Sequence, residues 1–305
     1  MGARRFERSP SSTLVAITAV VILAIAVGFL SYTAYQRAHP AGVGGGSAAP
    51  IPTFSLGVET AAPPPTPAAA VSPPLVPRAS ERFLAVGRGA MWRATAGECG
   101  GAAPTIDRST DGGRTWRSVT PGYLGLAQIG GLDAFQSTEA EAVAGLAGSC
   151  GVNLLRTYTQ GQFWDSYPTL LPAARYIDLE DASTVRLAGV SVDSPCVDAR
   201  GLRAAGSTVA LVCEGTAFAL RDGRWSALPE TDVAAVAVAD PSVYVAAATA
   251  DCDGLNITVH TGADVGMPVS LGCVPGSPSA AVAMAVVDGA AFVWSGNDVV
   301  RVDVP

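Results

Sequence analysis

The sequence predicts an all-β protein: a β-propeller of five or six small four-stranded blades, preceded by one transmembrane helix and a proline-rich stalk. Three observations lead to this prediction. Residues 13–35 form one long uncharged apolar run. Residues 81–305 consist of short runs rich in Val, Ala, Leu and aromatic residues, separated by Gly, Asp, Asn and Pro turns. A turn sequence that ends in tryptophan recurs at a spacing of 48 residues. Short strands with frequent tight turns and a repeat of this length are typical of propeller blades.

The apolar run at residues 13–35 predicts the membrane helix. At about 1.5 Å of rise per residue it covers roughly 35 Å, enough to cross a hydrocarbon core of about 30 Å. Three arginines lie in residues 1–12, and only Arg37 closely follows the run. The positive-inside bias therefore predicts a cytoplasmic tail at 1–12, with everything after residue 35 on the extracytoplasmic side of the cell membrane. The alternative is a cleaved signal peptide, but its apolar region is typically shorter, about 7–15 residues.

Residues 36–80 are predicted to be a linker. They hold ten prolines and the run Gly44-Gly45-Gly46. Proline favours extended polyproline II backbone, so this stretch is expected to act as a spacer. Within it, Thr53–Thr60 alternates apolar and polar residues, a period of two that predicts a stray strand docking on the main domain.

The clearest predicted blade lies in residues 202–229, and six candidate blade starts fall near residues 82, 131, 176, 200, 232 and 280. The third unit is short, so five blades remain an alternative. Pro121–Ile129 and Thr261–Ser279 lack a strand pattern and are expected to be irregular segments of a binding face. Tight turns separate the four strands predicted for the clearest blade, which are Leu202–Ala205, Thr208–Cys213, Thr216–Arg221 and Trp225–Leu228.

Two nonapeptides carry the repeat: RSTDGGRTW at Arg108–Trp116 and RTYTQGQFW at Arg156–Trp164. A shorter copy, LRDGRW, lies at Leu220–Trp225. The first copy resembles the Asp-box, Ser/Thr-x-Asp-x-Gly-x-x-Trp, of bacterial neuraminidase repeat propellers such as sialidases, sortilin-type receptors and photosystem II assembly factors. Four residues match it, namely Ser109, Asp111, Gly113 and Trp116. The degenerate copies keep Thr157, Gly161 and Trp164, and Asp222, Gly223 and Trp225.

The resemblance implies a structural role for these boxes. Each is expected to form the turn between the third and fourth strands of a blade. Asp111 would accept backbone N–H bonds, Gly113 would supply a permissive backbone, and Trp116 would pack between blades. The boxes therefore indicate a scaffold and do not themselves indicate catalysis.

The cysteine count predicts disulfides. Six cysteines lie on the expected outer side, where the compartment is oxidising, and they allow fifteen pairings. We expect Cys196–Cys213 and Cys252–Cys273, the pairs that are near in sequence, which leaves Cys99–Cys150. A metal site is disfavoured because no Cys-x-x-Cys spacing is present and His260 is the only histidine beyond the stalk.

The remaining sequence favours binding over catalysis. An enzyme resembling a sialidase would need an arginine triad and a Tyr–Glu pair; Arg93, Arg156 and Arg186 are candidates, but their contexts are typical of solvated or inter-blade side chains. Residues 81–305 hold 14 Arg against 24 Asp and Glu, so the basic surface of a nucleic-acid binder is missing. We expect no catalytic residue and no cofactor.

The sequence thus predicts a binding or assembly module for a protein or cell-wall glycan partner in a bacterial cell envelope. The candidate contact aromatics are Tyr123, Tyr158 and Tyr167. The alternative is a divergent sialidase-like glycoside hydrolase.

Overall fold

The computed structural model describes residues 76–136, 138–261 and 268–304. The chain divides into two compact units, residues 1–68 and 69–305, and the described residues all belong to the second. The predicted tail at 1–12, the helix at 13–35, the linker up to residue 75 and the stray strand at 53–60 lie outside them. Within the described ranges, no helix has the length and apolar character needed to cross a membrane.

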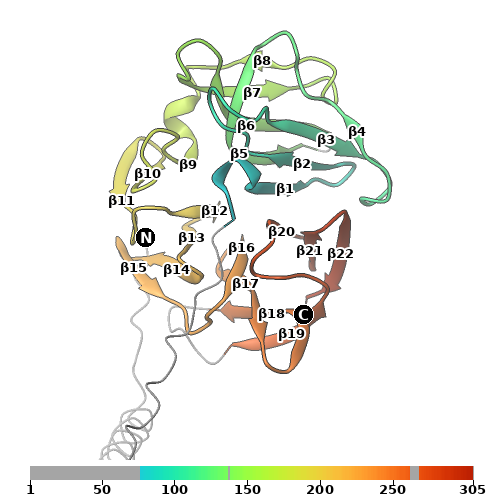
Figure 1. Cartoon of the computed structure of the whole chain (residues 1–305), viewed down its shortest axis with the longest axis vertical. Helices are drawn as coiled ribbons and strands as arrows, with labels where there is room; N and C mark the ends of the chain where they lie inside the picture. Colours follow the sequence, from blue (N-terminus) through green and yellow to red (C-terminus); the bar gives the residue numbers. More distant parts are fainter. Residues whose placement is uncertain (1–75, 137, 262–267, 305) are drawn as a thin grey trace, which may run out of the picture. The chain divides into compact units, whose positions relative to one another are not determined.

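Six antiparallel sheets form a ring, and each sheet is one blade (Figure 1). The first strand of every blade is innermost, and these inner strands pack against one another in order around the ring. The last blade packs against the first, so the ring is closed. The fold is a six-bladed β-propeller. This confirms the predicted all-β propeller and decides between five and six blades.

The first half of the ring begins close to the predicted blade starts, with a 3-10 turn, η1 (Arg78–Ser80), before the first strand. Blades 1 and 2 have four strands and blade 3 has three. Blade 1 comprises β1 (Arg82–Val86), β2 (Met91–Thr95), β3 (Thr105–Ser109) and β4 (Arg117–Ser118). Blade 2 comprises β5 (Leu126–Phe135), β6 (Glu139–Leu146), β7 (Val152–Thr157) and β8 (Asp165–Ser166). The short turn η2 (Leu171–Ala173) precedes blade 3, which comprises β9 (Arg175–Ile177), β10 (Thr184–Leu187) and β11 (Val190–Asp193).

The second half follows the predicted strands to within a few residues. Blades 4 and 5 have four strands, whereas three strands are described in blade 6. Blade 4 comprises β12 (Arg200–Ala205), β13 (Thr208–Cys213), β14 (Thr216–Arg221) and β15 (Arg224–Ala227). Blade 5 comprises β16 (Val233–Ala239), β17 (Ser242–Thr249), β18 (Cys252–Thr261) and β19 (Val269–Val274). Blade 6 comprises β20 (Val282–Val287), β21 (Ala290–Ser295) and β22 (Asp298–Asp303).

Three expectations are wrong in detail. The prediction of four-stranded blades fails for blade 3, in which the described residues form three strands. Thr261–Ser279 is not wholly irregular, because it contains β19, and Pro121–Ile129 contains the start of β5. In β19 only Val274 is buried, so this outer strand lacks the alternating apolar pattern from which a strand is recognised.

The core lies between blades. Among the described residues, apolar clusters fill five of the six interfaces between neighbouring blades. The exception is the interface between blades 2 and 3. In the interface of blades 1 and 2, Trp92 and Trp164 meet edge to face with ring centroids 5.9 Å apart. Such pairs add to the stability gained by burial.

The antiparallel connectivity gives the ring two loop faces. In the four-stranded blades, turns between the first and second strands and between the third and fourth strands lie on one side, which we call the box face. Turns between the second and third strands, together with the connections between blades, lie on the other, which we call the entry face because the inner strands begin there. The two faces therefore carry different sets of loops on one rigid scaffold.

Candidate binding site at the channel mouth

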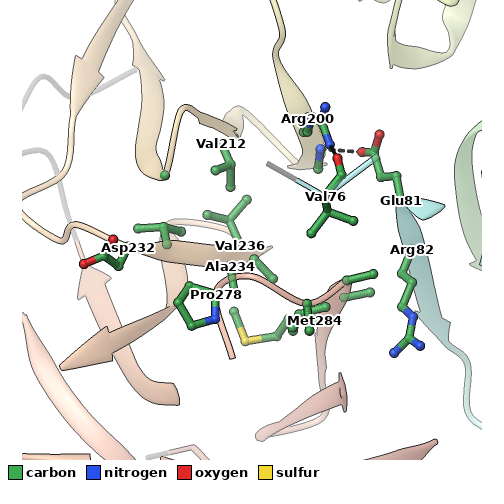
Figure 2. Close-up of a pocket in the computed structure, with 18 of the residues that line it drawn as sticks. Val76, Glu81, Arg82, Arg200, Val212, Asp232, Ala234, Val236, Pro278 and Met284 are labelled. Carbon is green, nitrogen blue, oxygen red and sulfur yellow. Dashed lines mark hydrogen bonds between the residues drawn. The ribbon is translucent and has the colours of Figure 1, made fainter. Parts of the chain in front are cut away.

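A cavity of about 540 Å³ opens on the entry face, between the inner strands β1, β12, β16 and β20. Its size is within the usual range for ligand pockets, roughly 300–1,000 Å³. Glu81, Arg82 and Arg200 lie on one side of it, as Figure 2 shows. The remaining wall is largely apolar and includes Val76, Val212, Ala234, Val236, Pro278 and Met284.

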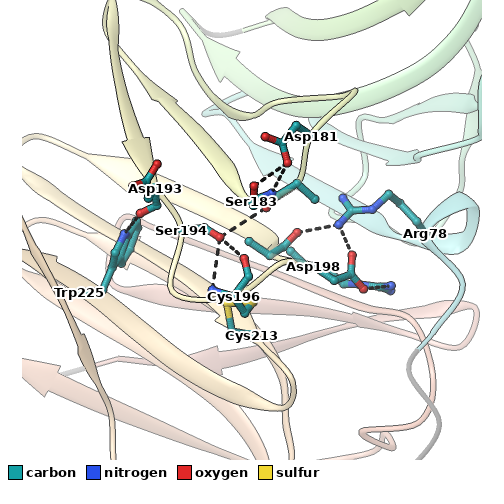
Figure 3. The surroundings of a disulfide bond; sticks show 12 residues. Arg78, Asp181, Ser183, Asp193, Ser194, Cys196, Asp198, Cys213 and Trp225 are labelled. Atoms are coloured by element: carbon teal, nitrogen blue, oxygen red, sulfur yellow. Dashed lines mark hydrogen bonds and ion pairs between the residues drawn. A yellow bond between two sulfur atoms is a disulfide. The ribbon is translucent and has the colours of Figure 1, made fainter.

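Residues 76–81 form a strap that connects blade 1 to blade 4 and lines the cavity. Glu81 accepts a hydrogen bond of 2.8 Å from the backbone N–H of Gly201. Arg78 donates to the Ala199 carbonyl at 2.8 Å and pairs with Asp198, as Figure 3 shows. Blades 1 and 4 are opposite each other in a six-membered ring, so the strap crosses the channel mouth.

Asp198 is the centre of this strap contact. Its second oxygen binds Arg200 at 2.6 Å, and Arg200 in turn donates to the carbonyl of Val76. Burial alone would raise the pKa of Asp198, but hydrogen bonds from Arg200 and Arg78 outweigh it and the pKa is lowered. The carboxylate is therefore held in its charged form between two guanidinium groups.

Two opposite charges lie deeper in the channel. Arg203, from β12, reaches across to the carbonyl of Met284 in blade 6, with 3.5 Å between Nε and O. Burial lowers its pKa, although Asp133 and Glu81 oppose this shift. The side chain of Asp133 is accessible to water but surrounded by the channel walls; this enclosure raises its pKa, which Arg203 opposes. Neither charge has its own ion-pair partner among the described residues, so the channel floor is polar below an apolar cavity wall.

Three disulfides hold the entry face together. They join Cys99 to Cys150, Cys196 to Cys213, and Cys252 to Cys273, the pairs that the sequence analysis expected. All six cysteines lie in entry-face turns or at the strand ends beside them. Cys196 and Cys213 lie next to the strap contact at Asp198 (Figure 3). The covalent links are therefore concentrated on the face that carries the cavity.

The first Asp-box forms the turn between β3 and β4, on the opposite face. Asp111 Oδ1 accepts backbone N–H bonds from Arg114 at 3.0 Å and from Thr115 at 2.9 Å. Gly113, at φ +87°, donates its N–H to Ser109 Oγ. The hydrogen bonds from Thr115 and Ser109 lower the pKa of Asp111. The side chains of Ser109 and Asp111 thus bond within their own turn.

The degenerate boxes occupy the equivalent turns of blades 2 and 4. In the second, Thr159 replaces the aspartate and accepts the N–H of Phe163 at 2.8 Å. Trp164 donates from Nε1 to Val119 of blade 1 at 3.0 Å. In the third, Asp222 and Gly223 both have positive φ, and Trp225 donates to Asp193 of blade 3 at 2.8 Å. Each of these tryptophans therefore reaches back to the preceding blade.

Trp116 also contacts the neighbouring blade that precedes its own in the ring, but it does so by packing. Its ring belongs to the apolar cluster between blades 1 and 6, which includes Val299 of β22. The indole N–H bonds to the Gly113 carbonyl within the turn at 2.9 Å. A Cβ added at Gly113 would lie 3.2 Å from Val299, so the glycine also permits this close approach.

The other candidate residues are not brought together. Arg93, Arg156 and Arg186 lie in blades 1, 2 and 3, and each pairs with a carboxylate of its own blade. The hydroxyl of Tyr123 bonds to the backbone of Trp164, with both contacts at 2.6 Å. His260 is buried and bonds to Glu230 at 2.8 Å. Among the described residues, no three His, Cys, Asp or Glu side chains converge as a metal ion would require.

A second depression, of about 600 Å³, lies between the first two boxes. It is lined by exposed residues such as Arg117 of β4 and Gln162, together with Tyr123. Many of its wall residues are polar and lie in turns or outer strands, whereas inner strands form much of the wall of the channel-mouth cavity. We therefore take the cavity as the better-formed candidate site.

The sequence analysis missed the residues of this cavity. Arg78, at the end of the predicted linker, is bonded to the ring, and Glu81, Asp198 and Arg200 carry no motif. Their partners are about 120 residues away along the chain. Only the ring topology brings such positions together.

No family model matches the chain, and no curated protein sequence matches it. Solved β-propellers have similar folds. The structure entitled "YCF48 bound to D1 peptide" is 11% identical, with a TM-score of 0.42 over 73% of this chain and 78% of that one. SapL1 lectin, in complex with alpha methyl fucoside, is 11% identical, with a TM-score of 0.42 over 75% and 97%. The Hadza microbial sialidase Hz136 is 12% identical, with a TM-score of 0.32 over 70% and 49%.

Proposed function

We propose that this chain is a membrane-anchored, extracytoplasmic β-propeller that binds a protein or cell-envelope partner through the channel-mouth cavity, without catalysis. The anchor is the apolar run at 13–35, and the outer location agrees with three disulfides, which persist in oxidising compartments.

The observation that carries the proposal is the cavity itself. Its wall of small apolar residues suits an apolar group of a partner, and Glu81, Arg82 and Arg200 offer polar contacts on one side. The strap and the Cys196–Cys213 disulfide, which is next to the lining residue Val212, brace the segments beside it. A braced cavity loses little conformational entropy on binding, which favours affinity.

Filling the cavity tests this proposal. Ala280 is exposed and lies on the cavity wall, so Ala280→Phe should narrow the mouth without disturbing the core. Ala227→Phe, on the exposed edge strand β15, is the matched control. After crosslinking in native membranes, the set of attached partners should be lost for Ala280→Phe and kept for Ala227→Phe.

Two results would contradict the proposal. One is an unchanged partner set in the Ala280→Phe variant. The other is turnover of a glycoside by the purified protein that disappears when one carboxylate of the cavity is neutralised, as in Glu81→Gln. The second result would favour the divergent glycoside hydrolase.

A further inference from the structure

The interface between blades 2 and 3 differs from the other five. None of the apolar clusters formed by the described residues lies at this interface. Towards the entry face, Leu179 of blade 3 covers Gly130 and Gly145 of blade 2. Blade 3 has only three short strands, and its apolar residues Ile177 and Val185 belong to the cluster with blade 4. Apolar contact on this side of blade 2 is therefore confined to the half nearer the entry face, where Val143 and Leu154 are buried.

The strand register identifies what blade 2 presents there. Ala140, Ala142 and Leu155 pack towards blade 1, so the alternate residues face blade 3. Cross-strand pairs place four charged side chains in one row on that side, in the order Asp133, Glu141, Arg156 and Asp165. Phe135 lies opposite Glu139 in the next row.

Three aromatic rings surround this charged row. Phe135 and Tyr158 meet at 5.4 Å with planes at 76°, and Tyr158 and Tyr167 meet at 6.0 Å with planes at 67°. Tyr158 is 53% exposed, so much of its ring is open to solvent. We call these three rings and the acids beside them, Glu139, Glu141 and Asp165, the blade 2 face.

The blade 2 face already binds one cation of its own. The guanidinium of Arg156 lies 4.9 Å from the centre of the Phe135 ring and pairs with Glu141 at 2.6 Å. Arg156 is the only base in the row and pairs with Glu141, so Glu139 and Asp165 have no ion pair among the described residues. A cation that lies over the face of an aromatic ring is attracted by the ring quadrupole, and carboxylates nearby add to that attraction.

We propose that the blade 2 face is a second binding surface, distinct from the cavity, that takes an arginine- or lysine-bearing segment of a partner protein. The incoming cation lies against the exposed ring of Tyr158, beside Tyr167, and its charge is met by Asp165 and Glu139. The excess of acids favours a cationic ligand over an anionic one through charge complementarity.

Binding of charged peptides to the full-length chain tests this inference. The probes are three fluorescent nonapeptides in which glycine alternates with arginine, glutamine or glutamate. We expect the arginine peptide alone to bind, and its affinity to fall as salt is raised. Tyr158→Ala keeps the net charge and should weaken binding about 3- to 30-fold, whereas Tyr158→Phe should retain it.

Two control substitutions distinguish a specific site from non-specific attraction of the arginine peptide to an acidic protein. Phe163→Ala removes an aromatic side chain that is 67% exposed but has no ring contact with the other three. Asp298→Asn removes one exposed charge in blade 6, for comparison with Asp165→Asn in the face. Phe163→Ala and Asp298→Asn should leave binding unchanged, and Asp165→Asn should weaken it.

Two outcomes would overturn the inference. The first is equal binding of the arginine peptide by wild type and Tyr158→Ala. The second is Tyr158-dependent binding of a neutral chitotetraose without binding of the arginine peptide, which would make the face a carbohydrate surface. Neither outcome would contradict binding at the cavity, which the Ala280→Phe variant tests separately because that substitution leaves the blade 2 face intact.

Discussion

The two loop faces of the ring are stabilised in different ways. The box face uses local turns whose hydrogen bonds are closed within four residues, as at Asp111, and tryptophans that pack against the preceding blade. The entry face has three disulfides and a strap that join segments from 17 to about 120 residues apart. The recognisable motif therefore lies opposite the cavity. A conspicuous motif can identify a scaffold without locating the surface that binds.

The largest expected effect is on the box face. Trp164 is 2% exposed and joins blades 1 and 2 through its ring and its N–H. Trp164→Ala should lower the free energy of unfolding by about 3–5 kcal/mol, because it leaves a cavity between blades. Denaturant titration measures this loss. The neighbouring Phe163→Ala, at a side chain that is 67% exposed, should have little effect. Equal effects of the two substitutions would show that the box tryptophans do not brace the ring.

The next effect is on the entry face. Replacing Cys196 and Cys213 together by alanine should cost about 3 kcal/mol in the chain-entropy model, since the bridge closes a loop of 17 residues. Hydrogen exchange should increase around the strap as well, because Cys196 lies beside the contact at Asp198 (Figure 3). A loss of stability without faster exchange at residues 78–81 would show that the disulfide does not stabilise the strap.

A smaller, local effect is expected at the strap. Asp198→Asn removes the charge that binds Arg78 and Arg200. Because the folded pKa of Asp198 is lowered, its contribution is complete above the ordinary pKa, near 3.8, and is lost as pH falls towards the folded value. The amides of Gly97 and Gly201, which bond to strap residues, should exchange faster in the variant at pH 7. Protection that is equal in the two proteins at pH 7 would contradict the assignment of the strap.

The smallest effect is expected at the first box. Asp111→Asn keeps an acceptor but removes the charge, so Tm should fall by less than it does in Trp164→Ala. The folded pKa of Asp111 is also lowered, so the difference in Tm should persist at pH 5 and shrink as pH falls below the ordinary value near 3.8. A difference in Tm that grows as the pH falls would contradict this assignment, because a carboxylate with a lowered pKa stabilises the fold less once it is protonated.

The scaffold was largely predictable because its determinants are local. Alternating apolar residues between Gly-Asp turns fixed the strands of blade 4, and the repeated Trp116 and Trp164 fixed the place of the boxes. The sequence also indicated that the third blade is short. The outer strand β19 was not, because it buries only one residue.

The cavity and the blade 2 face could not be predicted in the same way. The cavity depends on ring closure, which brings Glu81 to Gly201 and Arg203 to Met284 across the channel. The blade 2 face depends on the register of four strands and on the small size of blade 3. Tyr158 and Tyr167 were candidates from sequence, but their arrangement around Arg156 was not. No pattern within one segment encodes such contacts.

Site-specific photocrosslinking tests the central claim most directly. A photoreactive amino acid would replace Ala280 at the cavity mouth or the exposed Arg114 in the first box turn, and the chain would be illuminated in its native membrane. If binding takes place at the channel mouth and the box serves the scaffold, position 280 gives a discrete crosslinked partner and position 114 gives none. A partner captured from position 114 and not from position 280 would contradict the account.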